Sequence, residues 1–111
     1  MSSAEERLSV IQANYTSALE NEPHDLARAT SALEVTAIQT NVAAARETYF
    51  TAAAATLTES NALVEQAFEA AKVAQQAVDD ARRQSEQIAS LITKLGSATK
   101  AGVELLNAAK K

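Results

Sequence analysis

The sequence predicts an all-α protein, either an elongated helical hairpin or a three-to-four-helix bundle, with a coiled-coil-like, alanine-rich seam. Three observations predict this class. About a quarter of the residues are alanine, the strongest helix former. The 111 residues include only two glycines and one proline, so few positions favour a turn. Small or apolar residues also recur from Leu57 to Leu95 at alternating steps of three and four, the spacing of a heptad repeat.

The heptad repeat commits one face of a helix to burial against other helices. Its members are Leu57, Ser60, Val64, Ala67, Ala71, Ala74, Val78, Ala81, Ser85, Ile88, Ile92 and Leu95. Most of these side chains are small, so the core that they form is thin. A thin core gains from additional helices, and we therefore expect association with another chain, although the pattern also fits a core within one chain.

The first half of the chain is expected to hold two helices of one domain, which spans residues 1–111. The first helix is predicted at about 3–21, because Ser3 and Glu6 have the spacing of a capping box. Pro23 is predicted to interrupt it, since proline removes a helical hydrogen bond but suits a first turn. The second helix is then expected at about 24–57.

The second half is expected to hold two further helices. Cap-forming residues cluster at 56–61 and predict a turn there. A third helix is then expected at about 61–95. It is similar in length to the second helix, so the two are expected to pair as antiparallel arms. Gly96 and Ser97 are predicted to end it, with a short fourth helix at about 98–109. An alternative remains open, because steps of four through Ala45, Tyr49, Ala53 and Leu57 also fit one continuous long helix in an intermolecular coiled coil.

Composition excludes several classes of function. The net charge of −4 does not favour nucleic-acid binding, which needs a basic face. No apolar run approaches the roughly 20 residues of a membrane span, so no transmembrane segment is expected. The first residues show no secretory signal, so we expect a cytoplasmic protein and leave signal-less export open.

The sequence does not suggest an enzyme. It has one histidine, His24, and no cysteine, which excludes four-ligand zinc sites and leaves no nucleophile–histidine motif. His24 is expected to be an exposed turn residue beside Pro23. Glu65 and Glu69 share a helix face, but they flank the heptad repeat as solvated residues. We therefore expect no catalytic residue, no metal ligand, no cofactor and no small-molecule substrate.

We expect a structural or interaction protein that acts by helix–helix packing, as an oligomer or as a subunit of a larger assembly. Its partner would be a second copy or another helical protein. The predicted interaction seam comprises Val35, Ile38, Val42, Tyr49, Phe50, Val64, Phe68, Val78, Ile88, Ile92 and Leu95. In this prediction Tyr49, Phe50 and Phe68 meet near the closed end of the hairpin.

The alternative function is binding to a membrane or granule surface through a basic C-terminal helix. The residues predicted for this tail are Lys100, Leu105, Leu106, Lys110 and Lys111. Basic amphipathic helices bind anionic surfaces, but the absence of aromatic residues here predicts only weak contact. The last lysines also suit the negative end of a helix dipole without any partner.

Overall fold

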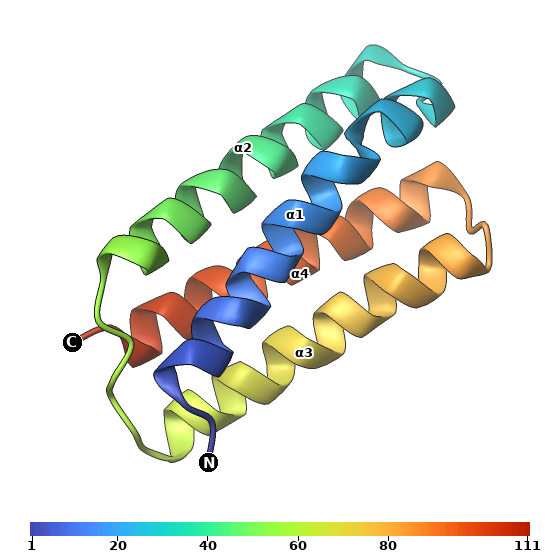
Figure 1. Cartoon of the computed structure of the whole chain (residues 1–111). Helices are drawn as coiled ribbons and strands as arrows, with labels where there is room; N and C mark the ends of the chain where they lie inside the picture. The colour runs from blue at the N-terminus through green and yellow to red at the C-terminus, as the bar shows by residue number, and fades with distance from the viewer.

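The computed structural model describes all residues, 1–111, as a bundle of four α-helices in which successive helices run antiparallel (Figure 1). The helices are α1 (Ala4–Arg28), α2 (Ala32–Ala54), α3 (Ala62–Arg83) and α4 (Ile88–Ala109). The bundle measures 42 × 25 × 18 Å. The predicted all-α class is confirmed, including the turn predicted at 56–61. The alternative of one continuous helix is wrong, because the chain reverses between α2 and α3 and again between α3 and α4.

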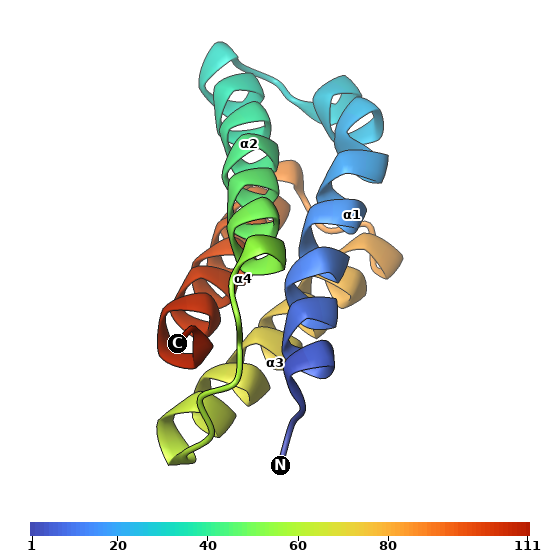
Figure 2. The same ribbon diagram turned by 60° about the vertical axis from the view of Figure 1, so that its left-hand side comes forward.

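The order of the helices around the bundle differs from the predicted pairing of arms. α1 packs against α2 and α4 packs against α3, while α2 also contacts α4 and α1 also contacts both α3 and α4. α2 and α3 do not contact each other, and they lie on opposite sides of the bundle with α1 and α4 between them (Figure 1). The turned view shows α1 alongside α2 (Figure 2). The predicted heptad repeat instead folds back on itself: Val78 and Ala81 of α3 pack in one cluster with Leu91 and Leu95 of α4.

The first helix does not end before Pro23, as predicted, but continues through it to Arg28. A proline inside a helix costs about 3 kcal/mol, so contacts of the last turn must offset that cost. Asp25 is buried there and forms an ion pair with Arg82 of α3. The second helix starts eight residues later than predicted, where the Ser31 hydroxyl accepts a hydrogen bond from the Glu34 amide at 3.2 Å.

The third helix ends at Arg83 and not at Gly96, which lies inside α4 together with Ser97. The end of α3 is a Schellman motif. The Ser85 amide donates to the Arg82 carbonyl at 3.2 Å, and the Glu86 amide donates to the Ala81 carbonyl at 3.0 Å. Ser85 has a φ of 52°, the left-handed conformation that usually requires glycine at this position.

Replacing Ser85 with glycine is expected to raise the free energy of unfolding by about 0.5–1 kcal/mol, because glycine adopts a positive φ without the Cβ clash. Urea unfolding measures this change. Ser97→Gly, at an exposed position inside α4, is the matched control and is expected to lower stability by about 0.5 kcal/mol. Equal destabilisation by both substitutions would contradict the role assigned to the φ of Ser85.

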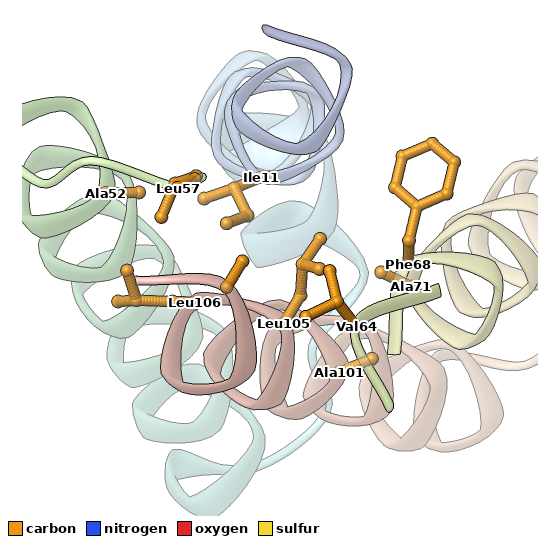
Figure 3. Close-up of a cluster of buried hydrophobic side chains, with 10 residues drawn as sticks. Ile11, Ala52, Leu57, Val64, Phe68, Ala71, Ala101, Leu105 and Leu106 are labelled. Atoms are coloured by element: carbon orange, nitrogen blue, oxygen red, sulfur yellow. The ribbon is translucent and has the colours of Figure 1, made fainter. Parts of the chain in front are cut away.

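The largest core cluster joins all four helices (Figure 3). Its members are Ile11, Ala52, Leu57, Val64, Phe68, Ala71, Ala101, Leu105, Leu106 and Ala109. The predicted separate tail helix is therefore the second half of α4, and Leu105 and Leu106, on which surface binding was predicted to depend, are buried. The three tail lysines are exposed. The end of the chain is tied to the α2–α3 loop, where the Lys111 amide donates to the Thr56 carbonyl at 2.9 Å.

Candidate interaction surface

The predicted interaction seam lies mostly inside a single chain. Ile38, Val42, Val64, Phe68, Val78 and Leu95 are buried, and Val35, Tyr49, Ile88 and Ile92 are half-buried. Only Phe50 is exposed, with 57% of its surface accessible. The buried members are already covered by other helices of the same chain, so Phe50 is the one member of the predicted seam that is fully open to a partner.

Arg7 closes one end of the bundle through a set of contacts that we call the Arg7 clasp. The side chain is only 2% exposed. Its Nη1 donates to the carbonyl oxygens of Leu57 and Glu59 at 2.8 and 2.9 Å. Its Nη2 donates to the Glu65 carboxylate at 3.1 Å, and Nε donates to the Ser2 hydroxyl at 2.9 Å. Every guanidinium nitrogen has a partner, so Arg7 holds the α2–α3 loop against α1 and α3.

The carboxylate of the clasp is held in its charged form. The Ser2 amide donates to Glu65 at 2.7 Å, and this hydrogen bond is the main cause that lowers the pKa of Glu65. Burial opposes this effect and raises the pKa, while hydrogen bonds from the Ser2 hydroxyl and from Arg7 each lower it by smaller amounts. Glu65, which the sequence suggested was a solvated flanking residue, is a structural partner.

At the other end of the bundle, the buried Asp25 forms an ion pair with the half-buried Arg82. Asp25 is 1% exposed and accepts two hydrogen bonds from the Arg82 guanidinium, at 2.7 and 3.1 Å. A polar pocket of about 390 Å³ adjoins this pair and is lined by Asn21, His24, Arg28, Arg82 and Ser85. Arg28 donates to the Glu86 carbonyl, so both arginines of the pocket already bind groups of the fold. His24 is exposed as expected, but it lies within α1 and not in a turn.

A polar network joins three helices near the middle of the bundle. The Asn14 amide of α1 donates to the Thr99 hydroxyl of α4 at 3.0 Å, and that hydroxyl donates to the Asn41 side-chain oxygen of α2 at 2.7 Å. Asn14 and Thr99 are buried. Hydrogen bonding at this depth is directional, so the network sets how the three helices face one another.

The outer face of α2 carries little charge. Its core side presents Ile38, Val42, Ala45, Thr48 and Ala52, all buried. Its opposite side presents a second series at steps of three and four, here called the outward stripe. The outward stripe consists of Leu33, Thr36, Thr40, Ala43, Glu47, Phe50 and Ala54, all exposed. The whole helix has only three charged residues, and a helix with little charge on any side is typically covered on both faces.

The outward stripe lies between two further features that extend it. Towards α4 there is an open groove of about 550 Å³. Its lining residues are Leu33, Thr36, Ala37, Thr40, Asn41, Ala44, Ile92, Gly96, Thr99 and Lys100. Towards α1 the Tyr15 ring stacks on Tyr49 with centroids 5.9 Å apart and meets Phe50 edge-on at 6.1 Å. The predicted third aromatic, Phe68, lies instead in the core with the Lys72 ammonium 5.2 Å from its ring centroid.

The spacing of the outward stripe is visible in the sequence, although our prediction followed the opposite face. Leu33, Thr36, Thr40 and Ala43 repeat at steps of three and four just as Val35 and Ile38 begin the core-facing series. Sequence alone does not tell which of two such faces turns inward. The packing of α1 and α4 decides this, because these two helices cover one side of α2 and leave the other open.

Comparisons with known proteins give no family for this chain. No family model, no curated protein and no solved structure matches it. None of the four helices is both long enough and apolar enough to cross a membrane. No three acidic or histidine side chains converge on a common point where they could hold a metal ion. The candidate site is the outward stripe of α2 with its flanking groove and aromatic cluster, because these features form one exposed surface with little charge.

Proposed function

We propose that this protein is a non-enzymatic interaction module that acts by helix–helix packing, as an oligomer or as a subunit of a larger assembly. Its contact surface is the outward stripe of α2. The observation that carries the proposal is the exposure of every member of this heptad-spaced stripe, which contains a single charge, on the side of α2 opposite the core. The partner surface is a helix with an apolar face.

The two large side chains near the ends of the outward stripe supply most of the expected binding energy. Leu33 is 83% exposed and Phe50 is 57% exposed. Complete burial of such a side chain contributes about 1.5–3 kcal/mol. Between them, Thr40 and Ala43 are small enough to let a second helix approach closely. The distance between two packed helix axes, about 8–10 Å, depends on the size of the side chains at the contact.

Exposed apolar side chains also occur on α3, but their surroundings differ. Leu63 and Val73 are 71% and 67% exposed. α3 has seven charged residues, and Glu69 and Lys72 lie on the same outer surface as Val73. Apolar residues among charges are ordinary on protein surfaces. Val73 therefore provides a control site of similar exposure outside the outward stripe.

Site-specific photo-crosslinking in the source cell tests the proposal. A benzophenone amino acid placed at Thr40 is expected to give one or a few discrete adducts, because this position contacts the partner. The same probe at Val73 is expected to give none. The far-ultraviolet circular dichroism of both variants should match that of the wild type. The comparison requires that the benzophenone amino acid is incorporated equally at the two positions. The proposal would be overturned if the probe at Thr40 then gave no adduct, or if it gave the same adducts as the probe at Val73.

A further inference from the structure

We infer that the partner of the outward stripe is a second copy of this chain, whose α2 packs antiparallel to the first. This inference rests on the proposed function and names its partner. From Leu33 to Phe50 the steps are three, four, three, four and three, so the spacing is the same in both directions. A two-fold axis that passes midway between Asn41 and Val42 then places each member of the series opposite another member.

The side chains brought together by this axis match in size. Leu33 faces Phe50 of the second copy, and the symmetry repeats this contact at the other end of the helix pair. At the centre Thr40 faces Ala43 of the second copy, so small residues meet where the helix axes are closest. Interaxial distances near 8 Å need such small residues at the contact.

The one charge in the outward stripe also finds a partner in this arrangement. Glu47 faces Thr36 of the second copy, where the threonine hydroxyl can donate a hydrogen bond to the carboxylate. A parallel arrangement in the same register would instead place Glu47 against Glu47, and like charges facing each other are destabilising. The charge therefore selects the antiparallel direction.

The expected dimer is weak, because the contact area is small. From Leu33 to Ala54 the stripe is about 32 Å long at 1.5 Å per residue. With a helix about 10 Å wide, two copies bury about 600 Å² in total, compared with about 1,200–2,000 Å² in stable complexes. Contacts from the flanking groove and from Tyr15 add to this area. Association should therefore depend strongly on concentration.

Sedimentation velocity on the purified chain measures the association directly. We expect a monomer at about 10 μM and an increasing dimer fraction towards 1 mM. Ala43→Glu places a new charge at the centre of the stripe and should weaken the dimer at least tenfold. Val73→Glu, at a similarly exposed position on α3, should leave it unchanged. A wild-type chain that stays monomeric at 1 mM, or equal effects of both variants, would overturn the inference.

Disulfide trapping tests the antiparallel register, since the chain has no cysteine of its own. A mixture of Thr36→Cys and Glu47→Cys chains should form a mixed disulfide, because the two positions face each other across the axis. Neither variant alone should form a disulfide-linked dimer. The two copies of position 36 lie about 16 Å apart along the helix axis, and a disulfide requires Cα atoms within roughly 7 Å of each other. Cross-linking of Thr36→Cys with itself would overturn the antiparallel arrangement.

The two proposals fail in distinguishable ways. A monomer in solution combined with a Thr40 photo-adduct to a different protein in the cell overturns self-association and supports the interaction surface. A monomer without any Thr40 adduct overturns both. The interaction surface and self-association are both supported if the Thr40 photo-adduct has twice the mass of the chain and the Thr36→Cys and Glu47→Cys chains form a mixed disulfide.

Discussion

Replacing Arg7 with alanine is expected to lower the free energy of unfolding by about 3–5 kcal/mol, the usual effect of breaking a buried, fully bonded charge. The substitution leaves the Leu57 and Glu59 carbonyls without their donor and removes one partner of Glu65. It also opens a space where the guanidinium filled the gap between α1, α3 and the α2–α3 loop. Urea unfolding followed by circular dichroism measures the loss.

Arg46→Ala is the matched control for this prediction. Arg46 is exposed on α2, and its removal should change stability by no more than about 0.5 kcal/mol. If the Arg7 variant loses less than 1 kcal/mol, the α2–α3 loop keeps its position without the Arg7 clasp, and the structural role assigned to this residue is wrong.

The pH dependence of stability provides a second readout of the Arg7 clasp. The pKa of Glu65 is lowered in the folded state, mainly by the Ser2 amide and further by Arg7. Its contribution to stability is therefore complete above the unfolded pKa, about 4.3, and is lost as the pH falls through the lower folded value. The stability difference between wild type and Arg7→Ala should accordingly narrow as the pH decreases from 5 to 3.

Replacing Asp25 with asparagine is expected to lower the free energy of unfolding by about 3 kcal/mol. The shape of the side chain is kept, but the Arg82 guanidinium loses its buried counter-charge. The last turn of α1, which follows Pro23, also loses the contact that offsets the proline. Amide hydrogen exchange at Leu26 to Arg28 should then increase more than exchange at Ile11 near the other end of α1.

A double-mutant cycle separates the ion pair from general damage to the fold. Asp25→Leu and Arg82→Met are each expected to be destabilising, because the first leaves the half-buried Arg82 without its counter-charge and the second leaves the buried Asp25 alone. Together they replace the pair with apolar side chains and should be less harmful than the sum of the single changes by at least 1 kcal/mol. Simple additivity would show that Asp25 and Arg82 contribute independently.

The sequence allowed prediction of the all-α class and of the α2–α3 turn, because alanine content, heptad spacing and clustered cap residues are local signals. The helix boundaries predicted at Pro23 and Gly96 were wrong, because tertiary contacts there outweigh the local cost of a poor helix residue. The S-x-x-E signature from Ser31 to Glu34 did mark the true start of α2. The end of α3 had no comparable signal, since Ser85 takes the position normally held by glycine.

The candidate site was harder to predict than the fold. The residues expected to bind a partner mostly pack within the chain. The helix predicted at about 61–95 is divided between α3 and α4, which pack against each other as a hairpin, and the helix predicted at about 98–109 is the second half of α4. The buried role of Arg7 was also not visible, because it depends on carbonyl groups fifty residues away. Such contacts follow only from the order of the helices around the bundle.

The polar network of Asn14, Thr99 and Asn41 has a consequence for the uniqueness of the folded state. Alanine-rich helix faces are smooth, so neighbouring helices could slide by one turn and lose little apolar contact. A slide of α1 against α4 by one turn, about 5.4 Å, would separate the Asn14 amide from the Thr99 hydroxyl and leave the buried amide without its partner. The network therefore penalises a shift of α1 or α2 along α4, and it selects one among several alignments of these helices that the apolar residues alone distinguish poorly.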